Sequence, residues 1–254
     1  MILIPTLQAP VQALMLREHG WTLPLSLTLT VPLPDRPIRR VLFIVGGNSY
    51  AAPLELAEVR SVLERIENLY LTVLEGEALT AASFTKAYQS ADFDLVWIAS
   101  HGEFDHLNPE ASFLYLTETE KVHFDDLRPA DIGQSRRLLV LNACDGATTA
   151  TTGSIGEIGL AASAAHASQA VISHLWPIPS NTVARVFAVR LAAALAQNLS
   201  FFDAYTATVS SLANGHEELG STLLDTAPQV LQVFEDNRDY FETVGSWGSA
   251  AFIE

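Results

Sequence analysis

Apolar residues recur along the chain in short runs, and the stretches between the runs show helical spacing. A short, mostly apolar run bounded by polar or turn-forming residues is typical of a buried strand. The runs predict five core strands and one late strand, at residues 41–45, 70–74, 95–99, 138–143, 170–176 and 250–253.

The spacing of apolar residues between these runs indicates helices. Val59, Val62 and Ile66 recur at intervals of three and four residues, and Val183 and Phe187 begin a similar series. Further helices are predicted at 80–89, 155–166, 201–212 and 228–234, and a small hairpin at 113–116 and 122–124. Strands that alternate with helices imply an α/β fold, with a mostly parallel central sheet flanked by helices and the hairpin as an insertion.

The first 40 residues differ from the rest of the chain. Between Leu25 and Val31 apolar and polar residues alternate, which predicts a half-buried strand, and prolines at 32, 34 and 37 end it. No linker rich in Pro, Gly or Ser divides the remainder, so residues 41–254 are predicted to form one domain. Residues 1–40 are predicted to be an extension that packs on this domain or docks a partner.

Charge and cysteine content narrow the classes of partner and compartment. Acidic residues outnumber basic ones by 29 to 14, for a formal net charge of -15. This disfavours nucleic acid and anionic membranes as partners and suits a basic substrate, although solubility alone is a simpler explanation. One cysteine excludes an intrachain disulfide, and no signal peptide or long apolar span is evident. We therefore predict a cytoplasmic location.

Two residues with catalytic chemistry follow predicted core strands. His101 comes shortly after the strand at 95–99, and Cys144 directly follows the strand at 138–143. Because the carboxyl ends of parallel strands form one rim of the sheet, these side chains are expected to meet there. An imidazole that takes the thiol proton produces a nucleophilic thiolate and later protonates the leaving amine. Backbone N–H groups of Gly102 and Cys144 are candidates for the oxyanion hole.

Simpler explanations exist for each feature taken alone. A single cysteine is often an inert buried residue, and a His-Gly pair is common. The other histidines show no metal-ligand spacing, so no metal site is predicted. The Gly46-Gly47 pair lacks the pattern of a dinucleotide-binding loop.

Four segments in order resemble one known family. The segment 99–103 (Ala-Ser-His-Gly-Glu) resembles the histidine motif of caspases and CHAT-domain proteases, and 141–146 (Leu-Asn-Ala-Cys-Asp-Gly) resembles their cysteine motif. The stretch 171–178 resembles the Leu-Trp-Pro strand end typical of CHAT domains, and 247–253 resembles the closing strand. The resemblance covers roughly residues 40–254.

The resemblance implies a caspase-haemoglobinase-like fold and the chemistry of a cysteine endopeptidase with His101 and Cys144 as its dyad. It implies no metal and no organic cofactor, and a regulated effector that acts on a protein or peptide substrate, with a regulatory protein as a further partner. The Thr-rich stretch after Cys144 is then either a regulated loop or an ordinary surface loop. The alternative is a scaffold or interaction module that keeps the fold without catalysis.

The substrate-binding residues inferred from the motifs are Asn142, Asp145, Ser173, His174 and Trp176. Residues 173–176 either offer a strand edge to an extended peptide or belong to a fully paired core strand. Relatives that cleave after Arg or Lys carry a pocket carboxylate, and metacaspase-like enzymes have Asp where this chain has Asn142. The cleavage preference is therefore open, although an acidic residue from elsewhere, such as Asp145, Glu103 or Asp105, remains a candidate partner for a basic side chain.

Overall fold

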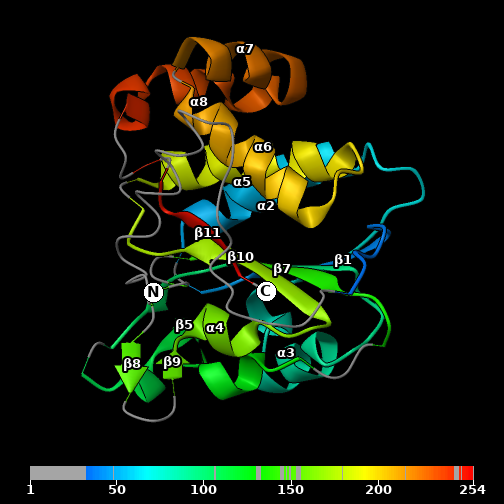
Figure 1. Ribbon diagram of the computed structural model, residues 1–254, viewed down its shortest axis with the longest axis vertical. Coiled ribbons are helices and arrows are strands. Elements are labelled where there is room, and N and C mark those ends of the chain that lie inside the picture. Colours follow the sequence, from blue (N-terminus) through cyan, green and yellow to red (C-terminus); the bar gives the residue numbers. More distant parts are fainter. Residues whose placement is uncertain are drawn as a thin grey trace.

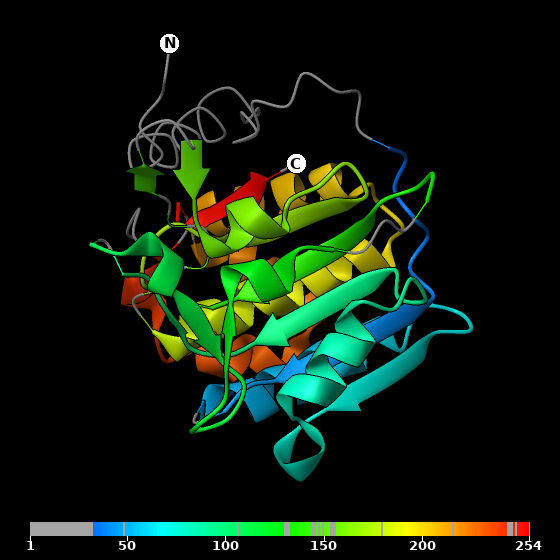
Figure 2. The same cartoon turned by 90° about the horizontal axis from the view of Figure 1, so that it is seen from below.

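The computed structural model describes residues 33–253 except 48, 106, 130–132, 144–145, 147, 149, 153–155, 179, 215, 243–245 and 247. A six-stranded sheet in the order β11-β10-β7-β3-β1-β2 forms its centre, and only β11 runs antiparallel to its neighbour (Figures 1 and 2). These strands are β1 Arg40–Val45, β2 Tyr70–Leu74, β3 Leu95–Ala99, β7 Arg137–Asn142, β10 Gln169–His174 and β11 Ala250–Ile253. The predicted mostly parallel α/β fold is confirmed.

Helices cover both faces of this sheet (Figure 1). The helices α2, α5, α6, α7 and α8 lie on one side, whereas α3 and α4 lie on the other. Their bounds are α2 Ala51–Leu63, α3 Ala81–Tyr88, α4 Leu160–Ala164, α5 Asn181–Ala196, α6 Phe201–Ala213, α7 His216–Thr226 and α8 Leu231–Glu235.

The alternation of side chains along β1 explains why two layers of helices are needed. Val41 and Phe43 face the core shared with α2, α5 and α6, whereas Leu42 and Ile44 face the core shared with α3 and α4. Successive residues of a strand point to opposite faces, so a strand that is apolar throughout must be covered on both sides. Each of these four side chains is buried.

Two small sheets lie outside the central one. The predicted hairpin is present as β5 Phe113–Tyr115 and β6 Lys121–His123, and β4 Gly102–Glu103 adds a third strand to it. The second sheet is a pair, β8 Ala150–Thr152 and β9 Gly156–Ile158. Part of the stretch after Cys144 that we predicted as a loop is therefore a strand.

The predicted helix at 155–166 is wrong over its first part. Residues 156–158 form β9, and α4 spans only Leu160–Ala164. Gly156 and Gly159 have low helix propensity, and the backbone of Gly159 is extended, so the helix starts after it. Pairing of β9 with β8 then outweighs the helical spacing of the apolar residues.

Two further differences concern the ends of the chain. The α7 helix was not predicted, although Leu219 and Leu223 lie one turn apart and are both buried. The segment predicted as one helix at 228–234 is a 3-10 turn at Pro228–Val230 followed by α8. The predicted strand at 25–31 lies outside the described residues.

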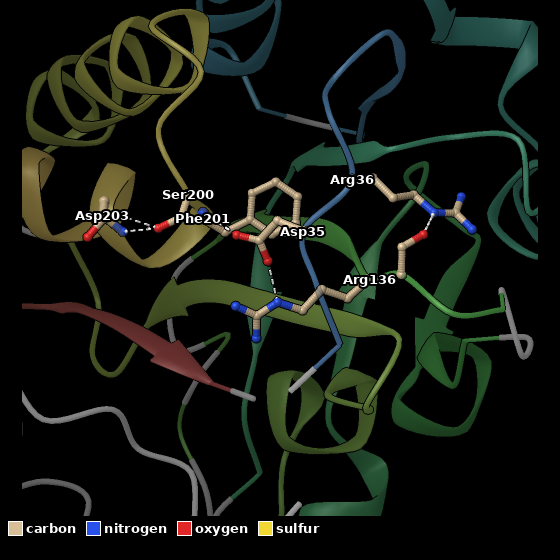
Figure 3. Close-up of polar contacts among 7 residues, drawn as sticks. Asp35, Arg36, Arg136, Ser200, Phe201 and Asp203 are labelled. Carbon is tan, nitrogen blue, oxygen red and sulfur yellow. Dashed lines mark hydrogen bonds and ion pairs between the residues drawn. The ribbon is translucent and has the colours of Figure 1, made fainter. Parts of the chain in front are cut away.

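The first described residues pack against the core (Figure 3). The Asp35 carboxylate pairs with Arg136, which immediately precedes β7, and also accepts the backbone N–H of Phe201 at 2.7 Å, at the start of α6. Arg36 donates from its backbone N–H to the Arg136 carbonyl at 2.9 Å and from its side chain to Ser135 at 3.0 Å. Residues 33–40 thus join β7 to α6 at the amino-terminal edge of the sheet.

Candidate active site

The central strands β3 and β7 are adjacent, and their register fixes where the two motifs lie. Ala99 pairs with Asn142 at the carboxyl ends of these strands. His101 follows Ala99 by two positions, and Cys144 follows Asn142 by two positions in the sequence. Cys144 itself lies outside the described residues. The fold thus brings the ends of both strands to the same edge of the sheet, and each motif residue follows its paired strand residue by the same number of sequence positions.

His101 is exposed, and its loop is held by the three-stranded sheet. Its carbonyl accepts the backbone N–H of Tyr115 at 3.0 Å. Gly102, the predicted oxyanion donor, is half-buried at the start of β4 and pairs with Leu114. The hydroxyl of Ser100 donates to the Tyr115 carbonyl. The hairpin insertion therefore fixes the backbone on both sides of the imidazole.

A small cavity lies at this edge of the sheet. Its volume is about 40 Å³, and His101, Asn142 and Ala143 line it together with Glu55 of α2. A water needs roughly 10–15 Å³ of such space, so the cavity holds about three waters or one small polar head group. Cys144 is the next residue after Ala143 in the sequence. The cavity therefore lies between the predicted general base and the residue that precedes the predicted nucleophile.

A chain of buried polar groups underlies the cavity. The Glu55 carboxylate accepts Nε1–H of Trp97 and Nδ2–H of Asn142, each at 2.7 Å. The Asn142 Oδ1 lies 2.9 Å from Nε2 of His174, whose Nδ1 lies 3.0 Å from the Ser249 hydroxyl. An amide oxygen can only accept, so Nε2 of His174 carries the proton and Nδ1 accepts from Ser249. Every donor in this chain points toward Glu55.

Burial shifts the pKa of both titratable groups in this chain. Loss of hydration raises the pKa of Glu55 from 4.5 to about 8, and the hydrogen bonds from Asn142 and Trp97 offset this only in part. Burial lowers the pKa of His174 from 6.5 to about 3. At neutral pH His174 is therefore uncharged, and Glu55 is mostly protonated while the cavity contains only water.

Of the five predicted substrate-binding residues, only Asn142 lines this cavity among the described ones. Ser173 and His174 are each 1% exposed, and β10 pairs with β7 on one side and β11 on the other. The strand-edge interpretation is therefore wrong for these two residues, because both edges of β10 are occupied. Trp176 is half-buried and packs against the core shared with α3 and α4. Asp145 lies outside the described residues.

Ser173 instead packs against residues of the cysteine motif itself. Its hydroxyl donates to the Leu141 carbonyl at 2.9 Å. A Cβ atom placed on Gly146 would lie 2.3 Å from this hydroxyl oxygen. Only glycine fits there without movement of the neighbour, so the backbone at Gly146 is packed directly on Ser173.

The sequence analysis missed Glu55. The signal was present, because Glu55 lies four and seven residues before Val59 and Val62, on the buried face of α2, where Glu58 is the other carboxyl. A carboxylate at a core position of a helix needs a polar partner or a ligand. Its buried partner Trp97 belongs to a strand that we interpreted only as core.

The described residues contain neither a metal centre nor a membrane-spanning helix. No group of three His, Cys, Asp or Glu side chains in this part of the chain is arranged to hold a metal ion. Among the same residues, no helix has both the length and the apolar character needed to cross a bilayer.

The family assignment rests on a match over nearly the whole chain. The model of the CHAT domain matches residues 8–253. The chain therefore belongs to the CHAT-domain family, which confirms the resemblance found in the motifs. No curated protein matches the chain.

Solved structures with a similar fold include three proteins at low identity. Separase from Saccharomyces cerevisiae, in complex with securin, is 8% identical with a TM-score of 0.47, over 89% of this chain and 12% of that one. Caspase-1 from Spodoptera frugiperda is 16% identical with a TM-score of 0.45, over 75% and 83% of the two chains. A structure described as a protease is 13% identical with a TM-score of 0.49, over 98% of this chain and 52% of that one. This chain thus spans only a small part of the separase and about half of the protease, and these similarities carry no argument about its activity.

Proposed function

We propose that this CHAT domain is a cysteine endopeptidase in which Cys144 is the nucleophile and His101 the general acid and base. The register that pairs Ala99 with Asn142 is the observation that carries the proposal, since each motif residue follows its strand by the same interval. The exposed imidazole and the cavity beside Ala143 support it. A protein or peptide substrate and a regulatory protein are the partners that fit this activity.

The chemistry requires only these two side chains and backbone donors. The imidazole of His101 takes the thiol proton, and the thiolate of Cys144 attacks the peptide carbonyl carbon to form a tetrahedral intermediate. Backbone N–H groups of Gly102 and Cys144 are the proposed donors to its oxyanion. The C–N bond then breaks, the imidazolium protonates the departing amine, and water hydrolyses the thioester to regenerate the thiol.

The rival proposal is a scaffold that retains the fold without catalysis. The lack of an evident pocket carboxylate in the sequence favoured the scaffold, whereas the intact pair of His101 and Cys144 favoured the enzyme. Glu55 is a carboxyl group that lines the cavity together with His101. A cytoplasmic location and the exclusion of nucleic acid as a partner stay predictions from composition.

Alkylation of the single cysteine separates the two proposals. A thiol activated by an imidazole should react with iodoacetamide at neutral pH much faster than an inert one, and His101→Ala should slow the reaction. His166→Ala is the matched control, because His166 lies just before β10, at the opposite edge of the sheet. Equally slow reaction in wild type and His101→Ala would favour the scaffold.

A further inference from the structure

We propose that the groove between α7 and residues 231–238 is a docking surface for a partner protein, which presents a basic, amphipathic α-helix to it. None of the residues that line this groove lines the cavity beside His101. Figure 1 shows α7 as the outermost helix on its side of the sheet. The inference goes beyond the proposed catalysis and does not depend on it.

Two rows of side chains form the walls of the groove, each with helical spacing. They are Glu217, Ser221 and Leu224 on α7, and Leu231, Glu235 and Arg238 on α8 and the 3-10 turn after it. The groove has a volume of about 350 Å³. This volume lies within the range of sites that take a ligand, so the groove has room for side chains of a partner.

Gly220 is buried in the interior of α7 and lines the groove between the two rows. Glycine is the least favourable residue in a helix interior apart from proline. A Cβ atom placed on Gly220 would lie 3.4 Å from Oε1 of Glu235 and from Cε1 of Phe234, which is ordinary van der Waals contact. The fold would therefore accept alanine and gain helix stability. Packing within this chain does not explain the glycine, which keeps the groove deep at its centre.

Two leucines give the groove an apolar part. Leu224 is 58% exposed, and Leu231 is half-buried against the core shared with α2, α5 and α6. A single exposed leucine is common on protein surfaces, but two leucines beside a groove offer a place for an apolar anchor of a partner. Arg190 of α5 donates from Nη1 to the Thr226 hydroxyl at 2.9 Å and so holds the end of α7 in place.

The charge around the groove favours a basic partner. Residues 216–239 contain one arginine, Arg238, which is paired with Glu235. The six acidic residues in the same stretch are Glu217, Glu218, Asp225, Glu235, Asp236 and Asp239. Nucleic acid, an anionic membrane or a second copy of this acidic chain would bring like charge to this surface, whereas a segment rich in Lys or Arg would be attracted to it.

The walls of the groove suit a helix better than an extended peptide. An extended peptide binds by pairing its backbone with a free strand edge, and the walls here are helical. The backbone groups of a helix bond to one another, so they need no partner in the groove. A helix also presents side chains at intervals of three and four residues, which match the spacing of both walls.

Two synthetic peptides of about 14 residues, made only of leucine and lysine, provide the probe. One has its leucines on a single helical face, and the other has the same composition in an order without such a face. Binding is measured by fluorescence anisotropy to the full chain with Cys144→Ala, which removes the proposed nucleophile. The amphipathic peptide should bind about tenfold more tightly than the scrambled one, and its affinity should fall as salt is raised.

Gly220→Ala gives a readout that a purely structural role would not give. It should raise the midpoint of thermal unfolding by about 2–4 °C, and it should weaken binding of the amphipathic peptide by about tenfold. Leu224→Ser should weaken binding by a similar factor. Leu199→Ser is the matched control at an exposed leucine between α5 and α6, and it should leave the affinity unchanged.

Equal affinity for the two peptides, binding of neither, or unchanged affinity in Gly220→Ala or Leu224→Ser would overturn the inference. A lower unfolding midpoint in Gly220→Ala would also overturn it, because the fold itself would then require the glycine. The proposed function is tested separately by cleavage, since peptide binding is measured without the nucleophile.

Discussion

Glu55 and His174 are the two titratable groups in the buried series of hydrogen bonds beneath the cavity. Replacing either one is expected to change how the stability of the protein depends on pH. Between pH 5.0 and 6.5 the unfolded state binds more protons at His174 than the folded state does, so this residue makes stability rise with pH. Its contribution is fully present above its unfolded pKa of 6.5 and is lost as the pH falls toward about 3. Over the chosen window it changes the free energy of unfolding by about 2 kcal/mol.

Glu55 acts with the opposite sign in the same window. Its folded pKa is raised, so the stability it contributes is fully present below its unfolded pKa of 4.5 and is lost as the pH rises through about 8. Between pH 5.0 and 6.5 this loss is also about 2 kcal/mol. The two effects therefore nearly cancel in the wild type. A variant that lacks one of the two groups should show the pH dependence contributed by the group that remains.

The assay is urea unfolding followed by tryptophan fluorescence at pH 5.0 and 6.5. Relative to wild type, the free energy of unfolding of Glu55→Gln should rise by about 2 kcal/mol from pH 5.0 to pH 6.5. That of His174→Gln should fall by about 2 kcal/mol over the same interval. Glu64→Gln, which replaces an exposed carboxylate just past the C-terminal end of α2, should follow the wild-type profile. Profiles for both core variants that run parallel to wild type would refute the opposed titration of these two buried groups.

Three further predictions concern packing, two of them near the candidate site and one at the opposite edge of the sheet. Gly46→Ala should destabilise by about 1–3 kcal/mol in thermal or urea unfolding, because its Cβ would lie 2.2 Å from Oγ of Ser100; stability equal to wild type would contradict this close approach. Gly146→Ala should lower kcat/KM, because the new Cβ meets the Ser173 hydroxyl. The double variant with Ser173→Ala lacks this hydroxyl and should recover part of the loss. Additive losses in the double variant would show that the two positions do not touch. Asp35→Ala should lower the free energy of unfolding by about 2 kcal/mol or more. The substitution removes both the ion pair with the buried Arg136 and the acceptor for the backbone N–H of Phe201 at the start of α6. A loss below about 0.5 kcal/mol would contradict the proposed stabilising role of Asp35.

The strands were predictable because their burial on both faces produces continuous apolar runs. The runs at 70–74 and 95–99 match β2 and β3 residue for residue. Strand β9, which lies within the helix predicted at 155–166, was not predictable from spacing, because its pairing with β8 involves residues that the local pattern does not connect. Local periodicity reports burial, but it does not report which distant segment supplies the partner.

The candidate site was predictable only where the chemistry follows a strand. His101 and the residues around Cys144 could be placed at one edge because each follows a core run. The apolar spacing of α2 marks Glu55 as a carboxyl on a buried face, but its role depends on how α2 packs against the ends of β3 and β7. For Ser173 and His174 the choice between a strand edge and a fully paired strand stayed open, because the sequence does not show that β11 returns to cover β10.

The most direct test of the central claim is a cleavage profile on a peptide library, with products identified by mass spectrometry. The account predicts new termini with the wild-type chain and none with Cys144→Ala or His101→Ala at equal concentration, with both variants folded. The same new termini from Cys144→Ala, or no cleavage by wild type, would contradict it.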